Sequence, residues 1–393
     1  PPPRYMKVAF VVPRYGDGIV GGAETLVAGL AEHLAATGTG VDVLTTGALD
    51  HRTWANVLPA GASTTRGVTV RRFPVRPRDA EAFGALHQRI AAGHWLDVEE
   101  QLRWAEESIT SPDLFAHLVQ HRTAYDVVCF APYLFGTTLW GLPLVPERAV
   151  LIPCLHDEPF AHLDVVRAVF DACRGFIFNS PAEAELAQKL YGLGDRVWGV
   201  VGLGFDPPRP ADPEGFRRRH GLTGPLLVYL GRKETGKNVP LLIEYVRRYR
   251  RLHGREVTLV LAGEGPVTAP GIRDLGYLRV TEKADAYAAA TVVCQPSVNE
   301  SFSIVLMEAW LAGTPVLVHA GCPVTTHHVV QANGGLAFGD FFEFAEALTR
   351  LLDDPPLRAR LGAQGRAYVE REYAWPVVTA RLRGVLERVV GDG

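Results

Sequence analysis

The segment 295–318, QPSVNESFSIVLMEAWLAGTPVLV, constrains the fold more than any other part of the chain. An apolar, β-branched run directly before it predicts a strand that ends in a polar loop at Pro296. From Ile304 onwards apolar residues recur with helical spacing, and Gly313 and Pro315 end that helix before another apolar strand. A strand, loop, helix and strand in this order predict one unit of a parallel α/β sheet.

Two carboxylates lie in this unit, Glu300 in the loop and Glu308 in the helix. On one continuous helix they would not align, because successive residues turn by about 100°. Since Glu300 precedes the helix, both can face one crevice, with the unpaired N–H groups of residues 301–304 forming an anion site between them. One carboxylate could then hold a sugar hydroxyl, the other a ribose, and the helix end the phosphates of a sugar nucleotide. The alternative is an ordinary βα unit with solvated acids.

The pattern PSxxESFxxxxxEAxxxGTPV, with seven residues between Glu300 and Glu308, resembles the signature of retaining, GT-B-fold glycosyltransferases of family 4. Further residues that match this signature are Pro296, Ala309, Gly313, Thr314 and Pro315. The family usually has glycine where this chain has Ser301 and Ser303, so the chain departs from the pattern in the loop that approaches the phosphates. The resemblance covers nearly the whole chain. It implies an α/β, GT-B architecture of two Rossmann-like, doubly wound domains facing a cleft.

The length of 393 residues is sufficient for two domains, and the Gly- and Pro-rich segment 201–213 reads as the linker. We expect an N-terminal acceptor-binding domain over residues 1–205 and a C-terminal nucleotide-sugar-binding domain over residues 206–374. In family 4 enzymes the last helix, here residues 375–393, packs back on the first domain.

Composition excludes several other classes of protein. The net charge of −3 gives no overall attraction to nucleic acid. Five scattered cysteines without a CxxC pair, and no apolar run near the ~20 residues that span a bilayer, predict a cytoplasmic protein. Arginine runs such as 247–251 could contact anionic lipid on the cytoplasmic face of a membrane, although such runs are more commonly solvated. No signal peptide is visible, and Met6 fits a natural start after five foreign residues.

Residues 16–21, GDGIVG, match the GxGxxG fingerprint of dinucleotide-binding folds. That fingerprint requires an acid at the end of the second strand, whereas Asp42 lies at its beginning, so a nicotinamide dehydrogenase is the weakest hypothesis. The loop better resembles the GGxE loop of family 4 enzymes. Its glycines, Gly21 and Gly22, let the backbone approach a diphosphate or sugar, and Glu24 either contacts the acceptor or favours the helix start.

The loop after the predicted strand 149–153 reads Leu155-His156-Asp157-Glu158. Sites of α/β proteins gather at such carboxyl ends of strands. In the resembled family a histidine at this place lies near the donor sugar, which implies that role for His156, and a structural histidine is the alternative. Asp157 and Glu158 are expected to contact the acceptor or the sugar.

In the second half, strand 226–230 leads into GRKETGKN, which resembles the phosphate-binding loop of the family. Arg232 and Lys237 can neutralise the donor diphosphate and stabilise charge on the departing nucleotide. The catalytic residues expected on this basis are Glu300, His156, Arg232 and Lys237. The expected donor contacts are Gly21, Gly22, Arg232, Lys237, Tyr277, Leu278, Arg279, Glu300, Ser301, Phe302, Ser303, Ile304 and Glu308, with residues 277–279 near the base.

No D-x-D sequence is present, so neither the metal clamp of the other main glycosyltransferase fold nor any cofactor is expected. The implied activity is retaining transfer from a UDP-, GDP- or dTDP-sugar to a glycan or lipid-linked acceptor. The motifs LHDEP and FNSPAE are similar to those of bacterial enzymes of surface polysaccharide assembly. A natural-product glycosyltransferase, a sugar-nucleotide epimerase or hydrolase, and a catalytically silent nucleotide- or glycan-binding protein stay open.

Overall fold

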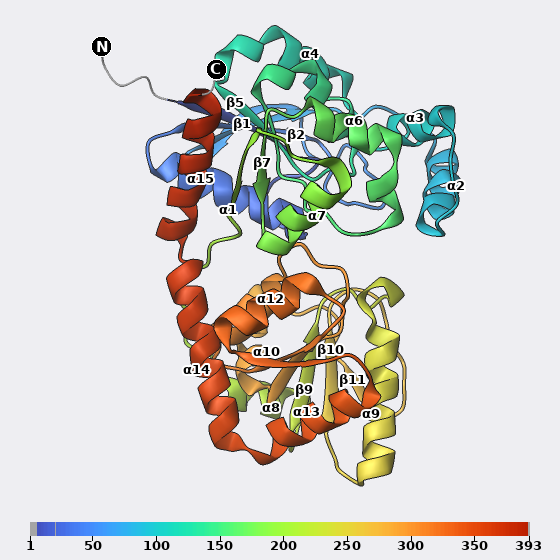
Figure 1. Ribbon diagram of the computed structural model, residues 1–393, viewed down its shortest axis with the longest axis vertical. Coiled ribbons are helices and arrows are strands. Elements are labelled where there is room, and N and C mark those ends of the chain that lie inside the picture. The colour runs from blue at the N-terminus through green and yellow to red at the C-terminus, as the bar shows by residue number, and fades with distance from the viewer. Residues whose placement is uncertain (1–5, 20, 392–393) are drawn as a thin grey trace. The chain divides into compact units, whose positions relative to one another are not determined.

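The computed structural model describes residues 6–19 and 21–391 (Figure 1). The segment before Met6, one position of the 16–21 loop, and the last two residues of the expected terminal helix lie outside the described residues. The chain divides into two compact units, Pro1–Gly204 with Trp375–Gly393 (unit 1) and Phe205–Ala374 (unit 2). The change from unit 1 to unit 2 falls within the Gly- and Pro-rich segment 201–213.

Unit 1 is built on an eight-stranded sheet with the order β3-β4-β2-β1-β5-β6-β7-β8. Neighbouring strands are parallel except for β3, which pairs antiparallel with β4. Apart from Lys7 at the start of β1, the strands β1, β5 and β7 are buried apolar runs, as expected for a parallel sheet that is covered by helices. The strands of unit 1 are β1 (Lys7–Val11), β2 (Gly40–Thr46), β3 (Gly61–Thr65), β4 (Val68–Phe73), β5 (Val127–Phe130), β6 (Ala149–Leu151), β7 (Gly175–Phe178) and β8 (Val197–Val200).

Helices pack on this sheet, and α2 and α3 lie side by side at one edge of the unit (Figure 1). The C-terminal helix α15 packs on α1, where the Trp375 ring stacks on His33 with centroids 3.7 Å apart. Gly29 of α1 permits this contact, because a Cβ there would lie 2.3 Å from the Trp375 ring. The α-helices of unit 1 are α1 (Gly22–Ala36), α2 (Ala80–Ala91), α3 (Val98–Glu106), α4 (Pro112–Gln120), α5 (Gly136–Leu139), α6 (Asp164–Ala172), α7 (Pro181–Tyr191) and α15 (Trp375–Gly391).

Unit 2 has a six-stranded, wholly parallel sheet with the order β11-β10-β9-β12-β13-β14. Its strands are β9 (Leu226–Leu230), β10 (Thr258–Ala262), β11 (Ile272–Asp274), β12 (Val292–Gln295), β13 (Val316–His319) and β14 (Gly335–Phe338). Its α-helices are α8 (Pro213–His220), α9 (Val239–His253), α10 (Val280–Ala289), α11 (Ile304–Leu311), α12 (Pro323–Ala332), α13 (Phe341–Asp353) and α14 (Pro355–Glu372). The 3₁₀ turns of the chain are Arg122–Ala124, Leu142–Leu144, Pro146–Arg148, Pro159–His162 and Thr235–Lys237.

Strand order fixes where a ligand site can form. In unit 2 the first strand, β9, has β10 on one side and β12 on the other, and in unit 1 β1 likewise separates β2 from β5. These are the doubly wound Rossmann topologies, in which ligands bind at the carboxyl ends of the strands where the order reverses. In unit 2 the reversal sets the loop after β9, residues 231–238, beside the loop after β12, residues 296–303.

Close packing anchors α11, the helix that carries Glu308. A Cβ on Gly365 of α14 would lie 2.1 Å from the Trp310 ring of α11, and a Cβ on Gly362 would lie 1.9 Å from the Gly313 carbonyl oxygen. Trp310 Nε1 also donates to the Gly334 carbonyl at 2.8 Å. Since only glycine fits at these contacts, α14 holds α11 at a fixed height on the sheet.

Some predicted element ends are wrong. Strand β6 stops at Leu151 and not at Pro153, because proline cannot donate to a strand ladder. In unit 2, β11 ends at Asp274, so the residues predicted near the base lie in the loop before α10.

Candidate active site

The loops after β9 and β12 meet through an ion pair. Lys237 Nζ lies 2.7 Å from Glu300 Oε1 and also donates to the Asn299 carbonyl at 3.2 Å. Only 18% of the Lys237 side chain and 12% of the Glu300 side chain are exposed, so solvent screens their attraction less than that of a surface pair. The strand order thus brings together two predicted catalytic residues that are 63 positions apart in the sequence.

Two further side chains tie these loops together. Gln295, the last residue of β12, donates from Nε2 to Glu300 Oε1 at 3.3 Å, and its buried Oε1 has no partner among the described residues. Asn238 donates from Nδ2 to the Pro296 carbonyl at 3.0 Å. Sequence analysis missed Gln295, although a polar residue that ends an apolar strand at its carboxyl end was a usable signal.

Glu308 is held by a buried tyrosine. Tyr287 of α10 donates its hydroxyl to Glu308 Oε2 at 2.7 Å, and Thr314 in turn donates to the Tyr287 carbonyl at 2.7 Å. Burial, followed by the charge of Glu308, raises the pKa of Tyr287 well above its ordinary value. The tyrosine therefore stays a hydrogen-bond donor, which leaves the other Glu308 oxygen for a ligand. Nothing in the local sequence marks Tyr287, because its contact is between two helices.

The loop after β9 separates three basic residues that the sequence places together. Arg232 is exposed and pairs with Glu234, with 3.3 Å between Nη1 and Oε1. Lys233 is only 1% exposed and pairs with Asp274 at 2.5 Å, so it is a structural residue. Glycine is required beneath the loop at Gly263, where a Cβ would lie 2.0 Å from the carbonyl oxygen of residue 231.

The serines that replace the usual glycines adopt different environments. Ser303 is the N-cap residue of α11 with φ +67°, its side chain makes no capping hydrogen bond, and its buried Oγ has no partner among the described residues. Phe302 packs between the rings of Phe205, His328 and Tyr373. Ser301 lies in the half-buried loop before it. The turn keeps the shape that favours glycine, and Ser303 occupies it under strain.

Replacing Ser303 with glycine is therefore expected to raise the melting temperature, by an amount that corresponds to about 1 kcal/mol, because it relieves a left-handed serine and removes an unpaired buried hydroxyl. Differential scanning calorimetry measures the effect. Ser297→Gly is the matched control, since the Ser297 hydroxyl donates to the Asn299 carbonyl at 3.0 Å and its loss should lower the melting temperature. A lower melting temperature for Ser303→Gly would contradict the strain.

The side chains of the three residues predicted near the base differ in exposure and in partners. Tyr277 is 61% exposed, Leu278 is buried, and Arg279 pairs with Glu282 at 3.0 Å at the start of α10. The Tyr277 ring is thus accessible to a ligand, whereas the side chain of Leu278 belongs to the core. Backbone contact with a base at these positions stays a prediction.

In unit 1 the glycine loop leads directly into α1, with Gly21 as the N-cap residue and Gly22 as the first helical residue. Glu24 accepts from Arg14 Nε at 2.9 Å, and both side chains are largely buried. Arg14 also donates to the Leu49 carbonyl at 3.2 Å. The Glu24 carboxylate thus holds the loop after β1 in place, a role that neither sequence interpretation included.

The contacts of Asp42 are structural, which agrees with our rejection of a dinucleotide-binding site at residues 16–21. It accepts from the Tyr125 hydroxyl at 2.9 Å and from Arg71 Nε at 3.1 Å, and Lys7 lies 3.6 Å away. The residue is buried at the beginning of β2 and is satisfied by these partners. Asp42 therefore has a structural role in the sheet of unit 1.

The loop after β6 contains His156 and two carboxylates, and each carboxylate has a polar partner. His156 Nδ1 lies 3.8 Å from Glu158 Oε1, and Glu158 accepts from the Tyr133 hydroxyl at 2.7 Å. Asp157 lies 3.3 Å from His162 Nε2 in an exposed pair. Tyr133 thus fixes Glu158 close to the imidazole, and this buried tyrosine was not identified from the sequence.

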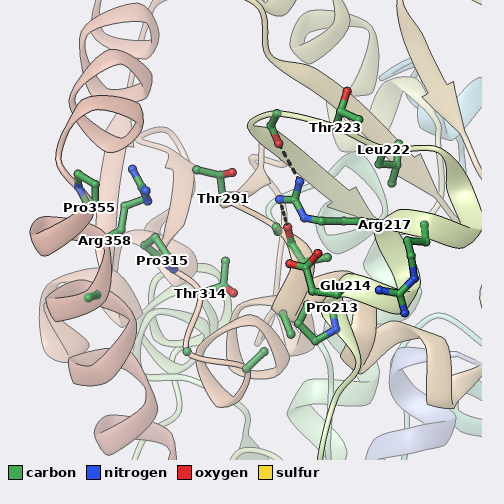
Figure 2. A pocket seen from close by; sticks show the side chains of 18 of the residues that line it. Pro213, Glu214, Arg217, Leu222, Thr223, Thr291, Thr314, Pro315, Pro355 and Arg358 are labelled. Carbon is green, nitrogen blue, oxygen red and sulfur yellow. Dashed lines mark hydrogen bonds between the residues drawn. The ribbon is translucent and has the colours of Figure 1, made fainter.

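Figure 2 shows a groove of about 870 Å³ in unit 2, lined by residues that include Glu214, Arg217, Thr291 and Pro315. Thr291 and Pro315 directly precede β12 and β13, so this groove lies at the amino ends of the strands, opposite the Lys237–Glu300 pair. The Arg217 guanidinium donates to the carbonyls of Gly224 and Ala289 at 2.8 and 2.6 Å. Its basic group is therefore committed to the fold and not to an anionic ligand.

Within residues 6–19 and 21–391, no group of three or more His, Cys, Asp and Glu side chains is arranged to hold a metal ion. No helix in the same ranges has the length and apolar character needed to cross a bilayer. All five cysteines are free thiols, and Cys154 is the one that is not fully buried.

Comparisons with known proteins agree with this architecture. Residues 214–368 match the family model described as glycosyl transferases group 1. D-inositol 3-phosphate glycosyltransferase of Frankia alni is 30% identical over 94% of this chain and 94% of the relative. Alpha-D-kanosaminyltransferase of Streptomyces kanamyceticus is 27% identical over 82% of this chain and 89% of the relative.

Solved structures show the same fold. Anabaena HepE in complex with UDP-glucose superposes with a TM-score of 0.73 at 18% identity, covering 98% of this chain and all of the other. Sucrose-phosphate synthase from Thermosynechococcus elongatus gives a TM-score of 0.72 at 18% identity over 99% of this chain and all of the other. With a relative at 30% identity over nearly its whole length, the chain belongs to the glycosyl transferases group 1 family and is a glycosyltransferase of the GT-B fold.

Proposed function

We propose that this enzyme transfers a sugar from a nucleotide-sugar donor to a hydroxyl acceptor, with retention of the anomeric configuration and without a metal ion. The observation that carries the proposal is the shielded Lys237–Glu300 ion pair where the strand order of unit 2 reverses. Glu308 follows on the adjoining helix with one oxygen fixed by Tyr287. A cation, a helix start and two oriented carboxylates at one sheet edge suit a sugar diphosphate.

Each group of unit 2 has a distinct role in this proposal. Lys237 and the first N–H groups of α11 neutralise the diphosphate as it departs, because donors fixed in advance stabilise developing charge most effectively. Glu308 binds the ribose hydroxyls, and Glu300 binds the hydroxyls of the transferred sugar beside the anomeric carbon. Arg232, exposed next to Glu234, supplies further positive charge at the mouth of the loop.

Unit 1 supplies the acceptor side. His156, oriented by Glu158, lies near the donor sugar in this proposal, and the glycine loop at Gly21 and Gly22 lets the backbone approach the substrates. Asp157, in its exposed pair with His162, is the carboxylate of this loop with the greatest access to an acceptor. The positive charge of Lys237 and Arg232 takes the place that a metal ion has in metal-dependent transfer.

UDP is the first donor base to test, because HepE is solved with UDP-glucose. D-inositol 3-phosphate is the first acceptor to test, because relatives that carry this name cover most of the chain. Surface polysaccharide assembly, a cytoplasmic location and contact with a membrane stay predictions from the sequence. A second candidate is transfer of an amino sugar in natural-product synthesis, which the similarity to the kanosaminyltransferase favours. Comparing turnover of UDP-glucose and UDP-glucosamine separates the two.

The donor site is tested by melting curves with UDP, GDP, dTDP, their sugar conjugates and NADH. A ligand at 100 times its dissociation constant adds about 2.7 kcal/mol to the free energy of unfolding, which is readily measured. We expect one nucleotide class to raise the melting temperature of the wild type and to leave that of Glu308→Ala unchanged. Glu370→Ala, which removes an exposed glutamate of the same unit, should keep the full response.

A response to NADH alone, or none to any sugar nucleotide, would overturn the proposal. A response without sugar transfer to any acceptor would favour the binding protein. Release of nucleotide without transfer would favour the epimerase or hydrolase.

A further inference from the structure

A buried carboxylate outside the donor loops connects two loops of unit 1. Glu183 of α7 is 1% exposed. Its Oε1 accepts from the Leu155 N–H at 2.6 Å, and its Oε2 accepts from the Asn179 N–H at 2.6 Å. Asn179 follows β7, whereas Leu155 lies in the loop after the neighbouring strand β6, directly before His156. One side chain therefore bridges the carboxyl ends of two adjacent strands.

Capping of α7 does not account for this arrangement. Ser180 already caps the helix by accepting from the Glu183 N–H at 3.2 Å. Helix α13 begins in the same way, since Asp340 caps it and Glu343 accepts from the Gly339 N–H at 2.6 Å, yet Glu343 is exposed. A glutamate at this helix position can thus accept from the N–H group four residues earlier with one oxygen while its side chain stays exposed. The additional contact of Glu183 is the bond to Leu155.

Burial of this carboxylate opposes folding, because removing a charge from water costs several kcal/mol. Burial raises the pKa of Glu183, whereas the N–H groups of Asn179 and Leu155 lower it and so favour the ionised form. Both oxygens accept from N–H donors, which is the geometry of an ionised carboxylate. A leucine of similar size would avoid this unfavourable burial but would leave two backbone N–H groups unpaired.

The loop that is hydrogen-bonded to Glu183 has a strained backbone conformation. Cys154 has φ +53°, a left-handed conformation that costs a non-glycine residue about 1–3 kcal/mol and persists only where the surroundings enforce it. Asn179 donates from Nδ2 to the Cys154 sulfur at 3.6 Å, and Glu183 binds the next N–H along the chain. The start of α7 therefore holds the turn at two successive residues.

We infer that Glu183 is a positioning residue, which holds the turn 154–156 in the conformation that presents His156 to the donor sugar. This inference rests on the role of His156 in the proposed function. The restraint acts through the backbone at Leu155, whereas the Glu158 carboxylate lies 3.8 Å from Nδ1 of the His156 ring. The backbone of the turn is thus held separately from the contact of the ring.

The Glu183→Gln substitution tests this restraint at constant size. An amide has one acceptor oxygen and a donor NH₂ group, so it cannot accept from both N–H groups. In place of one hydrogen bond, the NH₂ group would face a backbone N–H group, and both are donors. We expect turnover of UDP-glucose, measured as released UDP, to fall about 10- to 100-fold, the range that a misplaced catalytic group produces. Binding of UDP, which depends on unit 2, should stay within twofold of the wild-type value. Glu343→Gln is the matched control and should keep wild-type turnover.

A double-mutant cycle with His156→Ala separates positioning from a merely structural effect. If Glu183 acts through His156, the double variant turns over UDP-glucose at the rate of His156→Ala alone. Losses that multiply in the double variant would overturn the inference and leave the proposed function intact. Wild-type turnover in His156→Ala would overturn both the role of His156 and the inference. Failure of every variant and of the wild type to bind UDP, GDP or dTDP is instead the failure of the proposed function.

Should Glu183→Gln not fold, Glu183→Asp keeps the charge but is one methylene too short to reach both N–H groups. Amide hydrogen exchange then provides a readout that needs no substrate. We expect faster exchange at residues 154–156 in this variant, with unchanged protection of β7. Equal protection of residues 154–156 in the variant and the wild type would overturn the inference.

Discussion

Replacing Glu300 with glutamine is expected to lower turnover by about 10²- to 10³-fold, as the loss of one preorganised transition-state contact does in other enzymes. Glutamine has the same size, but it removes the charge that lies 2.7 Å from Lys237 Nζ and weakens the hold on the sugar hydroxyls. The melting temperature should change by only a few degrees, since the surrounding loop keeps the Asn238 bond to the Pro296 carbonyl. Steady-state kinetics with UDP-glucose, and a melting curve on the same sample, measure both quantities.

The control for this substitution is Glu370→Gln, which removes the charge of an exposed glutamate on α14. It should leave turnover at the wild-type level. Wild-type turnover in Glu300→Gln, with a substrate that the wild type uses, would contradict the assignment of Glu300.

The two lysines of the loop after β9 are expected to give different results. Lys237→Ala removes the cation that faces the diphosphate, so turnover should fall by about 10³-fold. Lys233→Ala instead leaves Asp274 without its buried partner, which typically lowers the free energy of unfolding by about 3–5 kcal/mol. Asp274 also accepts from the N–H groups of Val267 and Gly276, so the loss should spread to the loop after β11.

Chemical denaturation and kinetics of the two variants, measured side by side, test this contrast. Each lysine is the control for the other, because both lie in one loop and differ in burial and partner. A large loss of stability in Lys237→Ala with intact activity, or the reverse in Lys233→Ala, would show that the roles are misassigned.

The elements that the sequence predicts best are those with strong local signals. The helix 304–311 and the strand 226–230 have the predicted bounds, because apolar periodicity and flanking Gly, Pro or polar residues mark both ends. The sequence also places Lys237 and Glu300 in loops that follow strands, but their pairing is seen only in the structure, where the strand order of unit 2 makes those two loops neighbours.

Contacts between distant elements could not be predicted in this way. Tyr287, Tyr133 and Arg14 hold Glu308, Glu158 and Glu24, but nothing in their local sequence distinguishes them from ordinary core or surface residues. These partners depend on how helices and loops meet in three dimensions. Only the three-dimensional arrangement of the chain shows them.

Side-chain burial within one short motif was equally hidden. In Arg232-Lys233 the first side chain is exposed and the second is buried, and in Tyr277-Leu278 the order is the same. Adjacent residues point in different directions, but a loop has no fixed period from which the direction can be read. The strain at Ser303 is likewise seen only in the structure, where this serine has the positive φ that favours glycine.

The most direct test of the central claim is the anomeric configuration of the glycoside formed from UDP-glucose, whose sugar is α-linked, read by proton NMR. D-inositol 3-phosphate is the acceptor to use first, followed by glycan and lipid-linked acceptors, with GDP- and dTDP-glucose as alternative donors. The account predicts an α-linked product from the wild type and none above background from Glu300→Gln. A β-linked product, or the same α-linked product at the wild-type rate from Glu300→Gln, would contradict it.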